Sequence, residues 1–361
     1  MLEVAGVVAM ARTDLAAAEA LLGEAVAVRE QAAEPSSELV QSRVQLAELQ
    51  GRRLSFDASL ASLRAALDET LRVNGVAHID TSQTRLRLGD VLADMGRVRE
   101  SMAQFQVLQA DLAAAATPDI YTLHILASSL GRAQMRLGLL AESEATLRRG
   151  MQMQVQLNSG ARAAATLREY LVHTLLAQGR VDEAQALAQE AARLRLANGM
   201  QAGQRVWTPQ AYAALAVARA RHDMQASQHA LAGLVAGSDG DSANSLAWVN
   251  GSLARAGIEL EQGQPALAAQ RLDRLQKVLS EYGLVGRLPL IEGQRHTLCA
   301  RIAAAGGASA NAAAHFEQAR MAYASELSET APLMREWAQA RASAAASASS
   351  IDNSGARGSS C

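Results

Sequence analysis

The stretch LGDVLADMGRVRESMAQF, residues Leu88–Phe105, decides the fold of this chain. It places a small residue, Gly89, before a second glycine, Gly96, and then a small residue, Ser101, before the bulky Phe105. Gly96 predicts the end of a helix, because glycine readily adopts the left-handed conformation that closes a last helical turn. The small residues on either side predict two helices that approach each other closely. The stretch therefore predicts a helix, a tight turn and a second helix.

The same order of residues recurs along nearly the whole chain. We align the copies on the small residue that follows the turn, here called the anchor, and find eight anchors separated by 40 to 44 residues. The anchors are Ala18, Ala58, Ser101, Ser143, Ala184, Ala226, Ala268 and Ala312. A fixed period of this length is typical of a solenoid, in which each helix pair buries its apolar face against the next pair. The sequence therefore predicts an all-α solenoid of about eight helix–turn–helix repeats.

Four repeats depart from the pattern. Repeat 5 has Val172 at the position of its first helix where a small residue belongs. Repeat 2 has Arg53 in place of the turn glycine and Leu46 where the first helix should carry a small residue. Repeat 6 has Arg221 at the turn. Repeat 7 has Arg255 and Glu259 where apolar residues are expected, which indicates a slip of one residue in its first helix.

Prolines test this frame independently, because proline is tolerated in the first turn of a helix but not inside one. All six fall at a predicted joint between helices or in a predicted turn. They are Pro35, Pro118, Pro209, Pro265, Pro289 and Pro332. The prolines therefore support the predicted helix boundaries.

The repeats Leu88–Phe105 and Leu171–Leu187 are the best copies of a pattern that resembles the tetratricopeptide repeat, in the long 42-residue form found in kinesin light chains. The resemblance covers about residues 1–330; each motif is weak alone, and eight in phase are strong. It implies a right-handed superhelix whose first helices line the concave face. Because long repeats of this type are often joined to signalling domains, it also implies that this chain is the C-terminal region of a bacterial signalling protein.

The ends of the chain differ from the repeats. The sequence predicts a solenoid over residues 1–331, a capping helix over 332–343, and a disordered Ala/Ser-rich tail over 344–361. Trp337 in the capping helix is placed to cover the last repeat. At the other end the first repeat opens in the middle of its first helix, on Leu2. We therefore expect a fragment of a longer protein, and self-association through this truncated repeat.

Charge and hydropathy exclude several classes of partner. The net charge is −2 with mixed signs, so no strong field attracts nucleic acid or a membrane surface. No apolar run reaches the roughly 18 residues of a membrane span. Glu3 stands where a signal peptide has its positive region, and two cysteines, Cys299 and Cys361, are too few for a disulfide framework. These observations favour a cytoplasmic location.

Catalytic and cofactor motifs are absent from the sequence. It contains no Gly-rich dinucleotide loop, no phosphate loop and no Gly-x-Ser-x-Gly nucleophile elbow. His296 and Cys299 share a helix face, but two ligands do not make a zinc site. We therefore expect no enzyme, no catalytic residues, no cofactor and no metal.

A binding surface is predicted instead on the first helices. In this architecture the exposed inner positions lie one, four and five residues after the small residue of each first helix. The candidate partner-binding residues are Asp90, Asp94, Arg132, Arg136, His173, Leu215 and Arg219. They predict an acidic stretch followed by a basic one, with a weakly polar gap between Arg136 and Arg219. The alternative is that these side chains are only solvated helix faces.

Two classes of function follow. The first is a non-catalytic scaffold that holds a peptide or a helix of a protein partner in its concave groove. The second is the sensory or regulatory arm of a larger bacterial serine/threonine kinase or transcriptional regulator. The asparagine–lysine clamp with which some tetratricopeptide proteins bind C-terminal carboxylates is not recognisable, which disfavours binding of chaperone tails.

Overall fold

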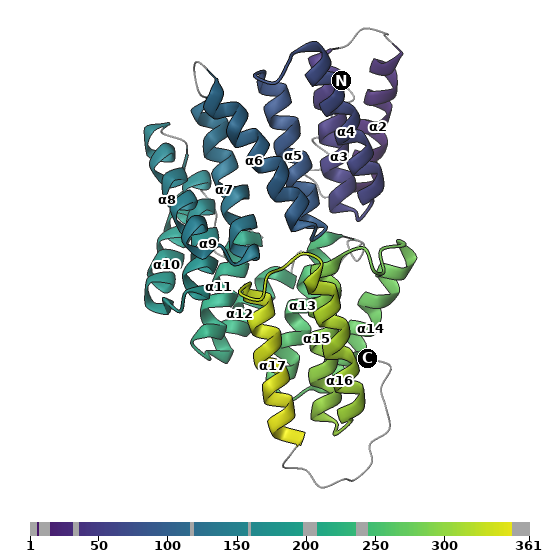
Figure 1. Cartoon of the computed structure of the whole chain (residues 1–361), viewed down its shortest axis with the longest axis vertical. Coiled ribbons are helices and arrows are strands. Elements are labelled where there is room, and N and C mark those ends of the chain that lie inside the picture. Colours follow the sequence, from purple (N-terminus) through teal and green to yellow (C-terminus); the bar gives the residue numbers. More distant parts are fainter. Residues whose placement is uncertain are drawn as a thin grey trace.

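The computed structural model describes residue 6 and residues 15–31, 36–115, 119–157, 160–197, 208–235 and 245–348. Within these ranges it contains sixteen α-helices and no strand (Figure 1). The helices are α2 (Leu15–Glu30), α3 (Ser37–Arg52), α4 (Phe56–Val73), α5 (Ile79–Asp94), α6 (Val98–Ala114), α7 (Ile120–Leu137), α8 (Leu140–Gln156), α9 (Ala161–Ala177), α10 (Val181–Ala197), α11 (Thr208–Ala220), α12 (Met224–Val235), α13 (Leu246–Glu261), α14 (Pro265–Glu281), α15 (Pro289–Ala305), α16 (Ser309–Ala324) and α17 (Pro332–Ala348).

The helices form pairs that match the predicted repeats. Repeats 2 to 8 are the hairpins from α3/α4 to α15/α16, α2 is the second helix of repeat 1, and α17 follows the last repeat. Pro265, Pro289 and Pro332 each begin a helix, and Pro209 is the second residue of α11. Pro35 and Pro118 lie outside the described residues. Among the described helices, none has an apolar stretch of the length that a membrane span requires.

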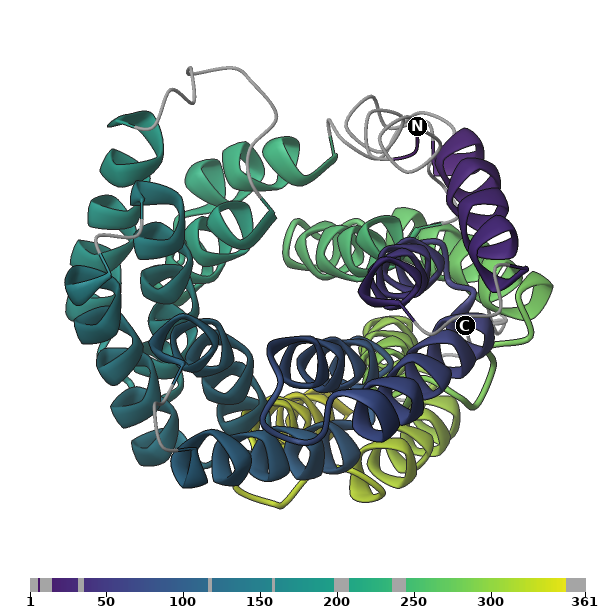
Figure 2. The ribbon, with the colours of Figure 1, turned by 90° about the horizontal axis from the view of Figure 1, so that it is seen from above.

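The repeats curve round into a superhelix with the first helices inside (Figure 2). From repeat 2 to repeat 6, neighbouring first helices contact each other directly, α3 with α5, α5 with α7, α7 with α9 and α9 with α11. Neighbouring second helices make far less contact with each other. Neighbouring first helices are therefore closer together than neighbouring second helices, so the first helices form the concave side, as predicted.

The superhelix closes on itself after about one turn, so that the last repeats lie against the early ones (Figure 1). One buried cluster joins Phe56 and Met95 of repeats 2 and 3 to Trp248 and Leu288 near the other end of the chain. Arg287 forms an ion pair with Asp57 across 230 residues of sequence. Gly96 lies so close to Leu290 that an added Cβ would approach its backbone nitrogen to 3.1 Å.

Backbone conformation at the turns corrects the predicted register in two repeats. Gly96, Gly138, Gly179, Gly263 and Gly307 all have positive φ, between 70° and 83°, as the pattern predicts. In repeats 2 and 6 the left-handed residue is not glycine but Leu54 (φ 68°) and His222 (φ 57°). Each lies one residue later than the predicted turn residue.

The anchors of repeats 2 and 6 shift by the same single residue. Ser59 and Ser227 are buried, whereas the predicted anchors Ala58 and Ala226 are exposed. The predicted positions were wrong because alanine and serine are both small, so residue type alone does not distinguish Ala58 from Ser59 or Ala226 from Ser227. The shifted register restores the bulky residue four positions after the anchor, at Leu63 and Leu231, both of which are buried.

Repeat 7, by contrast, is not slipped. Ala256 and Ala268 are fully buried at the two small positions. Glu259 lies in the helix interface because Arg271 neutralises it, with Arg271 Nη2 at 2.6 Å from Glu259 Oε1. The polar residue that suggested a slip is therefore part of a satisfied ion pair.

Small residues in the first helices make room for bulky residues of the second. A Cβ added at Gly89 would lie 2.3 Å from the ring of Phe105, and one added at Gly131 would lie 2.6 Å from Leu147. These distances are well below van der Waals contact, so a larger residue at either glycine would force the two helices apart. This close approach explains the spacing from which the repeats were recognised.

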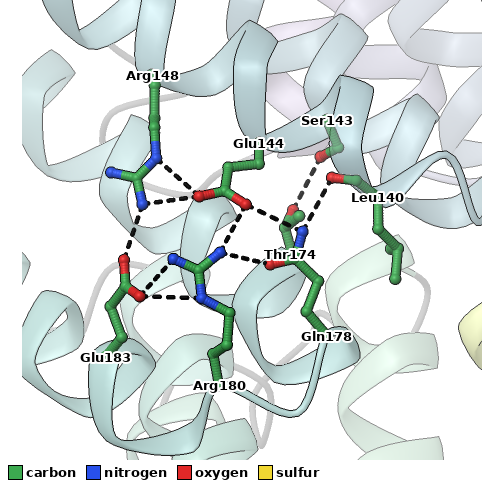
Figure 3. A network of polar contacts seen from close by, with 8 residues as sticks. All are labelled: Leu140, Ser143, Glu144, Arg148, Thr174, Gln178, Arg180 and Glu183. Atoms are coloured by element: carbon green, nitrogen blue, oxygen red, sulfur yellow. Dashed lines mark hydrogen bonds and ion pairs between the residues drawn. The ribbon is translucent and has the colours of Figure 1, made fainter.

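A polar network fastens repeat 4 to repeat 5 (Figure 3). Glu144 on α8 accepts from Arg148 Nε at 2.8 Å, from Gln178 Nε2 at 3.0 Å and from Arg180 Nη1 at 2.7 Å. Glu183 on α10 accepts from the same two arginines. Because each carboxylate is shared by two repeats, this network fixes their relative position.

The last helix caps the solenoid as predicted and extends further than predicted. It begins at Pro332 and ends at Ala348 rather than at residue 343. Trp337 is buried, and its Nε1 donates a hydrogen bond to the carbonyl oxygen of Phe316 at 2.9 Å. Residues 349–361 of the predicted tail, and most of the truncated first helix, lie outside the described residues.

The two cysteines differ in what the structure describes of them. Cys299 is fully buried in α15, whereas Cys361 lies outside the described residues. A cytoplasmic location stays a prediction.

Candidate functional site on the inner face

The candidate site is the surface of the first helices that faces the superhelix axis. Residues one and five positions after the small residue lie about 100° and 140° round the helix from it, turned away from the partner helix of the same repeat. We define the inner face by the residues at these positions, by the charged residues beside them and by the first turns of α17. It comprises Glu48, Arg52, Arg87, Asp90, Asp94, Arg132, Arg136, His173, Ala177, Arg219, Glu261, Arg301, Arg335 and Glu336.

The acidic and basic residues predicted on α5 and α7 are paired rather than separate. Arg132 Nη2 lies 3.4 Å from Asp90 Oδ1, and Arg132 Nη1 lies 3.7 Å from Asp94 Oδ1. Arg87 extends the network by pairing with Glu48 on α3, at 2.5 Å between Nε and Oε1. The acidic residues of α5 are followed by the basic residues of α7, but neighbouring first helices place these charges side by side, so that they pair instead of forming separate acidic and basic surfaces.

Arg136 has no such carboxylate partner. Its Nη1 donates to the carbonyl oxygen of Ala93 at 2.6 Å, and no described carboxylate lies within ion-pair distance of it. Burial and then the charge of Arg132 lower the pKa of Arg136 to about 10. Arg136 therefore remains cationic at neutral pH while its charge is poorly compensated.

Two neighbours of Arg136 also have shifted pKa values. Burial, together with the positive charge of Arg136, lowers the pKa of His173 to about 4, so this imidazole is neutral at pH 7. Burial raises the pKa of Asp94, although Arg132 and Arg136 oppose the rise. The predicted residues Asp94, Arg136 and His173 thus form one electrostatically coupled group.

Leu215 does not belong to the inner face. It is 4% exposed and lies in an apolar cluster with Ala230, Leu231 and Ile258. In the corrected register it occupies the small position of repeat 6, and Ala216 takes the inner position beside it. Arg219, four residues after Leu215, does remain on the inner face.

Further charged residues of the inner face were missed by the sequence analysis. Arg219 Nη2 lies 2.6 Å from Glu261 Oε1, and Arg335 Nη2 donates to the carbonyl oxygen of Ala177 at 2.9 Å. Burial raises the pKa of Glu336, opposed by Arg219, Arg301 and Arg335. Applying the same positional rule to repeats 7 and 8 would have found Glu261 and Arg301. No repeat signal marks Arg335 and Glu336, because they lie on the capping helix.

The net charge of the inner face is positive. This face holds seven arginines and five carboxylates, whereas the whole chain has a net charge of −2. Among the residues that the structure describes, no three His, Cys, Asp or Glu side chains are grouped so as to hold a metal ion. Its chemistry is that of charged hydrogen-bond donors and acceptors held on rigid helices.

Comparison with known proteins supports the fold. No family model and no curated protein matches the sequence. The Rap conjugation gene regulator of plasmid pLS20, solved in complex with the Phr* peptide, matches with a TM-score of 0.60 at 13% identity, covering 79% of this chain and 74% of that chain. A Rap protein complexed with competence and sporulation factor matches with a TM-score of 0.52 at 12% identity, covering 96% of this chain and 98% of that chain.

TPR-like repeats of a Podospora anserina putative kinesin light chain also match, with a TM-score of 0.43 at 15% identity, over 55% of this chain and 96% of theirs. At these identities the likenesses show the fold alone. The two Rap matches, whose TM-scores exceed 0.5, agree with a superhelix of repeated helix hairpins, the fold that the resemblance of the sequence to tetratricopeptide repeats implies.

Proposed function

We propose that this protein is a non-catalytic interaction scaffold that holds a peptide, or a helix of a partner protein, against its inner face. The observation that carries the proposal is the charged inner face itself, where partly exposed arginines and carboxylates from six first helices and α17 face a common axis. Rigid, solvated charges in a concave surface suit the selection of a partner by complementarity. The comparison structures were solved with a Phr* peptide and with competence and sporulation factor, which supports a peptide as the ligand class.

The alternative, a regulatory arm of a larger kinase or transcriptional regulator, stays a prediction. No feature of the described residues favours it over a free-standing scaffold. Both alternatives use the same inner face to bind a protein segment.

A selection from random peptides tests the proposal. Peptides with amidated C-termini are displayed, selected on the full chain, and then measured against two variants. Ala177→Trp places a large side chain on the inner face, whereas Ala145→Trp places one at an exposed position of α8 on a second helix. We expect selected peptides to lose affinity for the first variant and to keep it for the second, with unchanged circular dichroism. Selected peptides that lose affinity only for Ala145→Trp would place the binding site outside the inner face.

A further inference from the structure

We propose that the inner face selects partner segments bearing carboxylate side chains, and that Arg136 and Arg335 bind those carboxylates at the C-terminal end of α9. This inference rests on the proposed function and specifies its ligand. It concerns two arginines that have no ion-pair partner among the described residues, not the ion pairs that the protein forms within itself.

Arg136 retains most of its hydrogen-bonding capacity. A guanidinium group has five N–H donors, and Arg136 uses one on the carbonyl of Ala93, in the last turn of α5. The nearby carboxylates on α5, Asp90 and Asp94, form their ion pairs with Arg132, and they compensate the charge of Arg136 only in part. Arg136 is therefore positioned by a helix end and still has donors for a ligand.

Arg335 is held in the same way. Its Nη2 donates to the carbonyl of Ala177, the last residue of α9, and among the residues described no carboxylate lies within ion-pair distance of its guanidinium. The negative end of a helix dipole favours a cation at this place. Like Arg136, Arg335 therefore has a fixed position and unused donors.

The two arginines meet around one segment of α9. His173 lies one helical turn before Ala177 and is within the electrostatic influence of Arg136, while Arg335 is bonded to Ala177 itself. His173 is neutral and adds no competing positive charge, but its ring nitrogens can donate or accept a hydrogen bond. The segment from His173 to Ala177 thus lies between two cations that come from α7 and α17.

A carboxylate is the group that this arrangement fits. Arg binds carboxylates through two parallel N–H donors, which gives both affinity and orientation. An incoming anion would also relieve the repulsion between Arg132 and Arg136, which contributes to the lowered pKa of Arg136. Lysine-rich or arginine-rich segments would increase that repulsion and would be rejected.

Fluorescein-labelled hexapeptides test the inference by fluorescence anisotropy. The probes are amidated hexaglutamate, amidated hexaglutamine and hexaglutamine with a free C-terminal carboxylate. At low ionic strength we expect hexaglutamate amide to bind at least about tenfold more tightly than hexaglutamine amide. Salt at about 1 M, where the Debye length falls to about 3 Å, should remove most of that preference.

Charge variants of the full chain locate the effect. Arg136→Gln with Arg335→Gln should reduce hexaglutamate affinity by about tenfold or more, because both cations are lost while a polar side chain remains at each position. Arg149→Gln with Arg193→Gln, at exposed positions of α8 and α10, makes the same change of charge on second helices and should reduce it by less than about twofold. Thermal melting of both variants shows whether the fold is retained.

Each other outcome overturns the inference. Equal binding of hexaglutamate and hexaglutamine amides would show that carboxylates are not selected, and preference for the free C-terminus alone would show that the terminal carboxylate is read instead. Equal loss in the two double variants would mean a diffuse charge effect. If selected random peptides bind the inner face without enrichment in acidic residues, the proposed function stands and this inference falls. If no peptide of any composition binds, both fall.

Discussion

Repeats 5 and 6 are neighbours in the same solenoid and differ in almost every feature that defines a repeat. The two helices of repeat 5 have 17 residues each and are joined through Gly179 with φ 79°. Those of repeat 6 have 13 and 12 residues and are joined through His222 with φ 57°. Repeat 5 also stacks its first helix on both neighbours, whereas α11 has little contact with α13. The solenoid is therefore uneven along its length.

One position shows the difference at the level of single atoms. Three residues before the small position, repeat 5 has Glu169 and repeat 6 has Tyr212. Glu169 is 1% exposed and accepts two hydrogen bonds from the buried Arg195, at 2.9 Å and 2.7 Å. The hydroxyl of Tyr212 is buried and has no hydrogen-bond partner in the part of the chain described. At this position repeat 5 satisfies its buried polar groups, and repeat 6 leaves the Tyr212 hydroxyl without a partner among the described residues.

The largest effect is expected from Glu169→Ala, which takes the paired carboxylate away from Arg195. Removing one partner of a buried ion pair costs about 3–5 kcal/mol, because the remaining charge loses its compensation inside the protein. Urea denaturation followed by circular dichroism measures the loss. Tyr212→Phe at the matched position should instead be neutral or stabilising by about 1 kcal/mol, since it removes an unsatisfied hydroxyl. Similar losses of stability in both variants would contradict the difference in buried hydrogen bonding between the two repeats.

The next effect separates the true anchor of repeat 5 from the apparent anchor of repeat 6. Ala184 is fully buried between helices, so Ala184→Leu should overpack that contact and cost about 1–3 kcal/mol. Ala226 is exposed, and Ala226→Leu should change stability by less than about 0.5 kcal/mol. Urea midpoints compare the two variants directly. A large loss from Ala226→Leu would restore the register in which Ala226, not Ser227, faces the first helix.

Smaller and opposite effects are expected at the two turns. His222→Gly should stabilise repeat 6 by about 1 kcal/mol, because a left-handed conformation costs a side chain that much more than it costs glycine. Gly179→Ala should destabilise repeat 5 by a similar amount. Thermal melting of the two single variants and of their combination checks both signs. A combined variant as stable as the parent chain would show that the two turns compensate.

The last effect depends on pH and concerns His173, whose equivalent in repeat 6 is Ala216. The pKa of His173 is lowered from 6.5 to about 4 by burial and by Arg136. Between these values the unfolded chain binds more protons than the folded chain, so this group makes stability fall as the pH decreases from about 6.5 towards 4. His173→Ala should flatten that dependence, and Arg136→Gln should raise the pKa, as an NMR titration of the imidazole would show. A free titration of His173 near pH 6.5 in the parent chain would contradict this prediction.

The fold could be predicted from the sequence because close contacts between helices require small residues at regular spacing. Gly89 and Gly131 are small since Phe105 and Leu147 occupy the space of a side chain. The predicted register was wrong at repeats 2 and 6 because Leu54 and His222 adopt a left-handed backbone conformation, which is not expected of leucine or histidine. A pattern of residue types cannot reveal a turn that a non-glycine residue makes at a cost in energy.

The inner face was predicted by position but not by pairing. Asp90, Asp94, Arg132, Arg136, His173 and Arg219 lie on it, yet whether an arginine is free or paired depends on the distance between neighbouring helices. Leu215 was misplaced by the register of repeat 6. Arg335 and Glu336 could not be found from the repeats, because they reach the inner face only through the return of the chain to its early helices.

That return changes how the chain can fold and unfold. An open solenoid has local contacts only, so it folds by adding neighbours and frays from either end. Here Arg287 meets Asp57 over a separation of 230 residues, and Trp248 shares a core with Phe56. Contacts of such high contact order form late and carry a large loop-closure cost. The closed arrangement therefore couples repeats 2 and 3 to repeats 7 and 8, so that the loss of either end weakens the other and unfolding becomes a shared event rather than a progressive one.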